Sequence, residues 1–103
     1  MVSARIACWK FKPGMRNEGV KRMNTHLDEL KAQNGFTGVI SLLSVKSPDR
    51  VTVISFWNSS EAMGANQDGL FQKISGELTD ILVGPPQVAN QTVGIAEMAK
   101  IYA

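Results

Sequence analysis

The 103-residue sequence contains few of the side chains from which catalytic and metal sites are usually built. It has one Cys, one His and one Tyr. A single Cys excludes a disulfide framework or a thiolate metal cluster within one chain, and cytoplasm is then the expected compartment. Paired carboxylates, a phosphate-binding glycine loop and a serine elbow are also missing from the sequence. These absences argue against a metal centre and against the enzyme classes that depend on such motifs.

Long apolar runs and charge clusters are missing as well. No uninterrupted apolar stretch approaches the ~20 residues of a membrane-spanning helix, and the first residues lack the apolar core and cleavage site of a signal peptide. The formal net charge is +2, and no run of basic residues is longer than the pair Lys21 and Arg22. We therefore expect a soluble, unprocessed protein that binds neither membrane nor nucleic acid.

The residues that are present predict one domain over 1–103. Hydrophobic residues make up 44% of the sequence, which at this length is enough to close a core without disulfides. Between turn signals, apolar residues alternate or recur at helical spacing. The predicted elements are a strand at 4–11; a helix at 18–33, capped by Asn17 and ended by Asn34 and Gly35; strands at 36–45 and 51–57; a helix from Ser59, with Asn58 and Glu61 at capping-box spacing and interruptions at Gly64 and at Asp68 and Gly69; a second helical segment that stops at Gly84 to Pro86; and a strand at 87–99.

The order strand, helix, strand, strand, helix, strand is typical of the ferredoxin-like α+β fold, an antiparallel sheet with both helices on one face. The stretch "VTVISFW" at 51–57 is apolar on both of its faces, and Phe36, Ile40 and Leu42 are expected to share one face of the neighbouring strand. Leaving such side chains in water would forgo roughly 1.5–3 kcal/mol each. An apolar patch of that size usually marks an interface, so we predict a homodimer that packs sheet to sheet.

Three stretches carry a family resemblance: "KFKPG", "NGFTGVISL" and "VISFWNSSEA". They resemble the antibiotic biosynthesis monooxygenase family of the dimeric α+β barrel superfamily, over about residues 4–96. The most specific part is Trp57 at the end of a strand, followed closely by a Ser and a Glu. The resemblance implies a dimeric α+β barrel with a pocket between sheet and helices. It also implies an oxygenase that needs no metal or flavin cofactor, because the anion of its aromatic or polyketide-like substrate passes an electron to dioxygen.

The sequence departs from the family at several positions. A His that is common early in the second helical region is replaced here by Asn66. The haem-degrading relatives need an axial His, a Trp and an Asn. At those positions the sequence has Ile74 or Ser75, Ala65 or Asn66, and Ala7, which argues against haem degradation by the present chain. Its only Tyr, Tyr102, lies beyond the fourth strand.

Two residues are candidates for catalysis. His26 is the only side chain whose unperturbed pKa suits proton transfer near neutrality, and it lies at the edge of an apolar helical stripe. It is either a base facing the cleft or a boundary histidine half in water. Asp28 and Glu29 are expected to project away from it, so no metal site is predicted. Asn66 is either a hydrogen-bond donor to an enolate-like oxygen or a polar residue near a fraying helix end.

Substrate-binding candidates are Trp9, Trp57, Phe71 and Asn90. Trp57 either donates its indole N–H into the pocket or anchors the core where strand meets helix. Trp9 floors the pocket if it faces the helices and lines the dimer interface if it does not.

Two other side chains of the first strand are weighed in the same way. Cys8 is expected to be a small core residue, because nothing nearby would activate its thiol. Arg5 either binds an acidic group or is an exposed arginine at a strand edge. Neither residue is predicted to take part in catalysis.

Two functions remain open at this point. One is a cofactor-independent monooxygenase or related oxidoreductase acting on a small aromatic or polyketide-like molecule. The other is a non-catalytic dimer of the same fold that binds a small apolar ligand or serves in a stress response. The family resemblance favours the first, and the small number of polar candidates favours the second.

Overall fold

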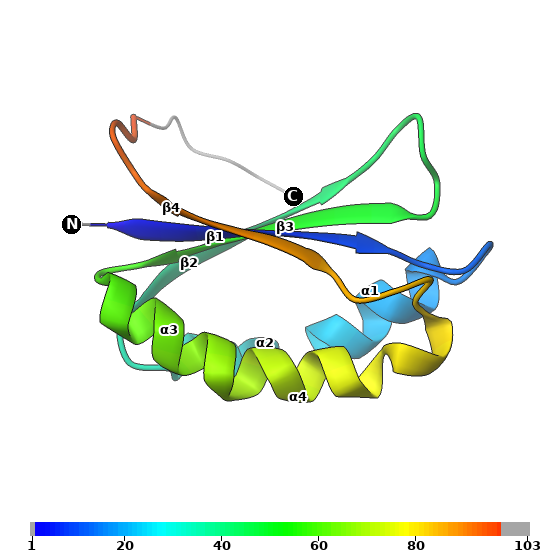
Figure 1. The fold of residues 1–103 in the computed structure, drawn as a ribbon, viewed down its shortest axis with the longest axis horizontal. Helices are drawn as coiled ribbons and strands as arrows, with labels where there is room; N and C mark the ends of the chain where they lie inside the picture. Colours follow the sequence, from blue (N-terminus) through cyan, green and yellow to red (C-terminus); the bar gives the residue numbers. More distant parts are fainter. Residues whose placement is uncertain (1, 98–103) are drawn as a thin grey trace.

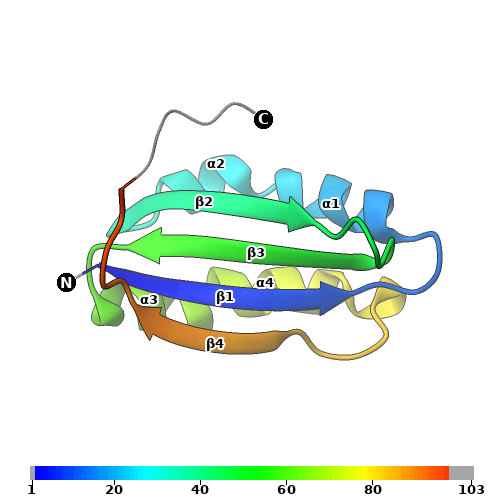
Figure 2. The same ribbon diagram turned by 90° about the horizontal axis from the view of Figure 1, so that it is seen from above.

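The computed structural model describes residues 2–97 and confirms the ferredoxin-like α+β fold. Four antiparallel strands form one sheet in the order β2-β3-β1-β4, and all the helices lie on one face of it (Figures 1 and 2). The elements are β1 Ser3–Lys10, α1 Arg16–Asn24, α2 Leu27–Lys31, β2 Phe36–Leu43, β3 Arg50–Trp57, α3 Ser60–Asp68, α4 Leu70–Glu77, the 3₁₀ helix η1 Thr79–Ile81 and β4 Gln87–Thr92.

The core lies between the sheet and the helices. Trp9 and Phe11 point toward the helices and are buried together with Val51 of β3 and Leu78, which follows α4. Because every second residue of a strand lies on the same face, the position of Trp9 shows which residues of β1 face the helices. Ser3, Arg5, Ala7 and Trp9 face the helices, and Cys8 lies on the bare side. The expectation that Cys8 belongs to the core is therefore wrong: the thiol is exposed.

The predicted first helix is two helices. Helix α1 starts after Met15, not after Asn17, and the chain leaves the helical path at Thr25 and His26 before α2 begins at Leu27. The Thr25 hydroxyl donates to the carbonyl oxygen of Arg22 at 2.6 Å, and the His26 N–H donates to Met23 at 3.0 Å. Such tight bonds to the third residue back compete with the helical ladder, so the helix breaks there.

The second helical region also differs in detail from the prediction. Ser59, not Asn58, caps α3, and its Oγ accepts from the Ala62 N–H at 3.1 Å. Gly64 does not interrupt α3, whereas the break at Gly69 is confirmed. Strand β4 ends at Thr92 instead of running to 99, and 98–99 lie outside the described residues.

One bulge changes which side chains share a face of β2. Phe36 pairs with Trp57, but a register shift follows and Gly38 pairs with Phe56. Phe36 therefore lies on the helix side with its ring 5.6 Å from that of Trp57, so the expectation that it shares a face with Ile40 and Leu42 is wrong.

The face of the sheet away from the helices carries an apolar row. Ile40 pairs with Ile54, Ile54 with Ile6, and Ile6 with Ala89, so the row crosses all four strands. Leu42 is 49% exposed on the same side. No helix of the described residues covers this face (Figure 1).

Candidate functional site

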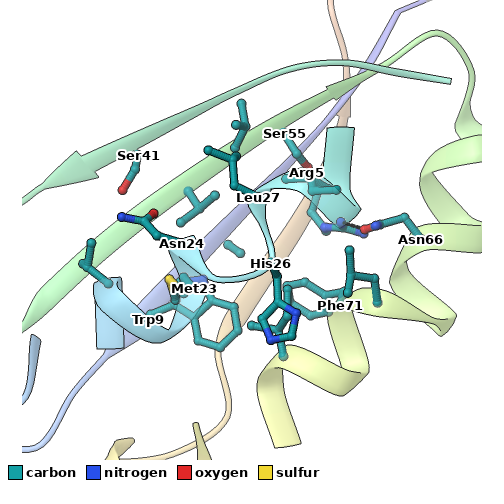
Figure 3. Close-up of a pocket in the computed structure, with 17 residues that line it drawn as sticks. Arg5, Trp9, Met23, Asn24, His26, Leu27, Ser41, Ser55, Asn66 and Phe71 are labelled. Carbon is teal, nitrogen blue, oxygen red and sulfur yellow. Dashed lines mark hydrogen bonds between the residues drawn. The ribbon is translucent and has the colours of Figure 1, made fainter. Parts of the chain in front are cut away.

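A cavity of about 260 Å³ lies between the sheet and the helices (Figure 3). This volume is slightly below the ~300–1,000 Å³ typical of small-molecule sites, so only a small ring system would fit. Both α1 and α4 contribute apolar walls, and the sheet forms the floor. The apolar lining residues are Ala7, Trp9, Val20, Met23, Leu27, Leu30, Val39, Val53, Leu70, Phe71 and Ile74.

Arg5 is the buried charge of this cavity. Arg5 is 3% exposed, because β1 lies between two other strands and the side chain points toward the helices. The interpretation of Arg5 as an exposed arginine at a strand edge is therefore wrong. Burial lowers the pKa of its guanidinium to about 10, so the group still carries its proton at neutral pH.

Aromatic rings and one amide surround the Arg5 guanidinium. Its central carbon lies 4.6 Å from the ring centroid of Phe71 and 5.9 Å from that of Trp57, distances at which a cation is attracted to the ring face. Its terminal nitrogens donate to the Asn66 Oδ1 and, at 3.4 Å, to the carbonyl oxygen of Met63. These contacts hold the cation in a mostly apolar space, whose other polar lining residues are Asn24, His26, Ser41, Ser55 and Asn66.

Asn66 is buried and holds Arg5 in place. Its Oδ1 accepts from Arg5, and its Nδ2 donates to the Oε1 of Gln33 at 3.0 Å (Figure 3 shows Asn66 and Arg5 pointing toward each other). The two bonds fix the orientation of the amide, because only its oxygen can accept from a guanidinium. Asn66 is thus an ordered residue of the cavity and not a fraying helix end.

Trp9 has an unpaired indole N–H. Its Nε1 is buried and has no hydrogen-bond partner within residues 2–97. A buried N–H without an acceptor is costly, but this nitrogen has almost no surface open to the cavity, so the donor is not presented to a ligand there. The ring also packs against Phe71, with centroids 5.5 Å apart.

Trp57 does not line the cavity. It is fully buried behind Arg5, and its Nε1 donates to the Ser55 Oγ at 2.9 Å. The indole N–H is therefore already used inside the protein. Of the two interpretations of Trp57, this geometry favours the core anchor.

His26 lies at the rim of the cavity. Its Nε2 is 2.6 Å from the Oε2 of Glu77 on α4, and its Nδ1 is 3.2 Å from the Oε1 of Glu29 on α2. The expectation that Glu29 projects away from His26 is thus wrong. The bonds from Glu77 and Glu29 raise the pKa of the imidazole, although burial and the nearby Lys73 lower it.

This geometry leaves no free ring nitrogen on His26 to act as a base. Figure 3 shows the imidazole directed toward α4 and away from the pair of Arg5 and Asn66. The imidazole instead joins α2 to α4, because its two nitrogens contact Glu29 and Glu77.

The remaining candidates divide between the cavity and the surface. Phe71 lines the cavity between Trp9 and Arg5. Asn90 is exposed on β4 outside the cavity lining, and its Nδ2 donates to Gln67 at 3.2 Å. Tyr102 lies outside the described residues.

Residues 2–97 contain neither a metal-binding cluster nor a membrane-spanning helix. In that range no three His, Cys, Asp or Glu side chains gather closely enough to hold a metal ion. No helix there has the length and apolar character needed to cross a bilayer.

Arg5 is the site residue that sequence reasoning missed. The signal was present in the alternation of β1, where Arg5, Ala7 and Trp9 are spaced by two and share a face. The pattern alone did not say which face meets the helices or that β1 is a central strand.

Comparison with known proteins gives a family and a fold. The model of the antibiotic biosynthesis monooxygenase family matches residues 2–72. Among curated protein sequences, none matches this chain.

Solved structures at low sequence identity share the fold. A Bordetella bronchiseptica protein provisionally assigned to the antibiotic biosynthesis monooxygenases is 20% identical, with a TM-score of 0.78 over 91% of this chain and 98% of its own. A protein of unknown function from Nitrosomonas europaea is 17% identical, with a TM-score of 0.82 over 96% and 95%. SnoaB of Streptomyces nogalater, a cofactor-independent oxygenase solved as a point mutant, is 12% identical, with a TM-score of 0.78 over 92% and 95%.

Proposed function

Because the chain belongs to the antibiotic biosynthesis monooxygenase family, we propose that it is a cofactor-independent monooxygenase for a small aromatic or polyketide-like molecule. The observation that carries the proposal is an apolar cavity with a buried cation, Arg5, at one end. An electron-rich ring needs only to be held as its anion, away from water, for dioxygen to oxidise it.

The reaction balances with dioxygen as the sole oxidant. A ring CH₂ next to a carbonyl loses a proton to give an enolate, and the enolate passes one electron to dioxygen. The substrate radical and superoxide then form a C–O bond, the resulting peroxide anion takes up a proton, and the hydroperoxide so formed loses water to leave a carbonyl. Overall, CH₂ and O₂ become C=O and H₂O.

The residues divide the work as follows. Arg5 stabilises the developing negative charge from one end of the cavity. Asn66 acts through Arg5 as a positioning residue, while one of its amide hydrogens remains for a ligand. His26 closes the mouth of the cavity and does not act as the base, so the substrate must lose its proton to solvent or enter as its anion.

Oxygen consumption with a hydroxylated anthrone tests this function. We expect protein-dependent uptake of oxygen and one ¹⁸O atom in the product when ¹⁸O₂ is supplied. Arg5→Met should lower kcat/KM about 10- to 100-fold, the loss expected for a hydrogen bond to a charged group. Arg50→Met, which removes the same charge from an exposed position, is the control. Uptake that is the same with and without protein would contradict the proposal.

One observation favours the alternative, a non-catalytic module that binds a small ligand. No Asp, Glu or Tyr among the described residues lines the cavity, and the imidazole of His26 is engaged by two carboxylates. A protein of this kind would bind an aromatic compound in the same cavity without consuming oxygen. The oxygen measurement therefore separates the two functions.

We propose in addition that two copies pair through the bare face of the sheet. Ile54 lies at the centre of the apolar row, flanked by Ile6 and Ile40. Ile54→Asp should convert a particle of about twice 11.2 kDa into one of 11.2 kDa, because a charge on an apolar interface costs several kcal/mol unless it is paired. Light scattering measures the mass. Thr92→Asp, on the helix side of β4, should leave it unchanged, and a wild-type protein of 11.2 kDa would refute the pairing.

A further inference from the structure

A row of ion pairs joins two helical arms of the protein. The first arm is α1 and α2, on the β2 side of the sheet, and the second is α4 with η1, on the β1 side (Figure 2). Three side-chain pairs cross between the arms and form what we call the seam. They are Arg22 with Asp80 at 2.8 Å, His26 with Glu77 at 2.6 Å, and Lys73 with Glu29 at 3.7 Å.

The pairs of the seam follow one another in order along both arms. Positions 22, 26 and 29 are spaced by four and three residues, and they meet positions 80, 77 and 73, which run in the opposite direction of the chain. Spacings of three and four place side chains on one face of a helix, so a polar face of each arm meets that of the other. Within residues 2–97 no backbone hydrogen bond joins 16–31 to 70–81, so the contact between the arms depends on side chains.

The same two arms are opposite walls of the cavity. Val20 and Met23 of the first arm and Phe71 and Ile74 of the second arm line it, and His26 lines it from within the seam (Figure 3). The distance between the arms therefore sets the width of the cavity. At about 260 Å³ the space is smaller than most small-molecule sites, so a larger ligand needs the arms to separate.

We propose that the seam is a pH-sensitive strap, which keeps the cavity narrow until loss of the His26 contacts lets α2 move away from α4 and admit a larger ligand. This rests on the proposed function, since that ligand is the substrate of the same site. The helical path is already interrupted at Thr25 and His26, so α2 can move without bending a continuous helix. Helix α2 has five residues, none of them buried, and half-exposed ion pairs contribute little to stability, so the strap can open while the domain stays folded.

His26 is the member of the seam that titrates closest to neutral pH. Its ring nitrogens lie 2.6 Å from a Glu77 oxygen and 3.2 Å from a Glu29 oxygen, and only the protonated ring has two N–H groups to donate to both. The charged groups around it are Glu77 and Lys73 of α4, Glu29 of α2 and Arg22 of α1. The bonds from Glu77 and Glu29 hold the pKa of the imidazole above its usual value, although burial and Lys73 lower it. The strap is therefore closed below this raised pKa and opens as the pH rises through it.

Acrylamide quenching of Trp9 fluorescence tests the proposal without any ligand. Trp9 is 3% exposed and lines the cavity, and in a Trp57→Phe protein it is the only tryptophan. We expect its Stern–Volmer constant to rise about two- to fivefold from pH 6 to pH 9, the change in open population that one exposed ion pair contributes. The midpoint should lie above the ordinary histidine pKa of about 6.5. At pH 6, about 0.5 M NaCl should also raise the constant, because salt screens exposed pairs.

Three variants of the same Trp57→Phe protein identify the group that titrates. His26→Gln should give the high quenching constant at both pH values, because glutamine carries no charge. Glu77→Gln keeps the histidine and the shape of its partner, and it should lower the midpoint, because Glu77 is the main cause of the raised pKa. Lys31→Gln removes a charge from the exposed end of α2 outside the seam, and it should match the starting protein. Circular dichroism should show that each protein stays folded from pH 6 to pH 9.

A quenching constant that is the same at pH 6 and pH 9 would overturn the proposal, and so would a pH-dependent change that persists in His26→Gln. A purely structural seam would give one of these two results, with a loss of stability in His26→Gln and nothing more. The proposed function fails in a different way. In that case the quenching of Trp9 follows the titration of His26, but no hydroxylated anthrone drives oxygen uptake.

Discussion

Trp57→Ala is expected to lower the free energy of unfolding by about 3–5 kcal/mol, the usual cost of removing a large aromatic ring from a core. The side chain is 0% exposed, contacts the Phe36 ring edge-on, and donates its N–H to Ser55. The truncation would also leave the Ser55 hydroxyl without its donor and the Arg5 guanidinium without one aromatic neighbour. Urea denaturation followed by circular dichroism measures the loss.

Trp57→Phe keeps most of the ring and loses only the N–H, so a loss of about 1–2 kcal/mol is expected from one buried hydrogen bond and some volume. Val45→Ala, at a side chain that is 98% exposed, should leave stability unchanged. If Trp57→Phe kept full stability but abolished protein-dependent oxygen uptake, the interpretation of Trp57 as a core anchor would be wrong and its role in the site would have to be direct.

The fold was predictable because its signals are periodic. Strand-forming residues marked β1, the nearly continuous apolar stretch at 51–57 marked β3, and the pair Asn34 and Gly35 marked the end of the first helical region, where Gly35 has a φ of +80°. The order of the elements then left few topologies to choose between. None of these predictions required contacts between residues far apart in the chain.

The details that failed depend on contacts that periodicity does not contain. The break at Thr25 and His26 coincides with bonds from the Thr25 hydroxyl and the His26 N–H to carbonyls three residues back, which compete with the helical ladder. The bulge after Phe36 turns that ring toward Trp57 on the next strand, a partner 21 residues away. Local pattern could not reveal either one.

In the candidate site as well, some residues could be predicted from local sequence and others depend on contacts between distant parts of the chain. Trp9 and Phe71 could be named as ring-binding residues because large apolar side chains on a buried face are visible in the sequence. Arg5 could not be placed, because its burial follows from the strand order, in which β1 pairs with both β3 and β4. His26 stood out only because it is unique, and its carboxylate partner Glu77 is 51 residues away.

Gly19→Ala is expected to destabilise the protein by about 1–3 kcal/mol, although alanine normally stabilises a helix relative to glycine. Gly19 lies inside α1, where the helix approaches the Phe11 ring so closely that a Cβ would overlap three of its carbons, the farthest at 2.8 Å. Phe11 is 1% exposed and cannot rotate away without disturbing Leu78 and Val51. The helix must then move outward.

Gly64→Ala is the matched control, because that position in α3 has no atom within 4 Å of the added Cβ. It should raise the free energy of unfolding by up to about 1 kcal/mol, so urea denaturation should separate the two variants by about 1–4 kcal/mol. An outward shift of α1 would also move Val20 and Met23 away from the cavity and lower protein-dependent oxygen uptake in Gly19→Ala alone. If both variants gained stability, α1 would not be held against Phe11 as closely as the structure places it, and the cavity would lack the fixed wall that recognition of a flat ring requires.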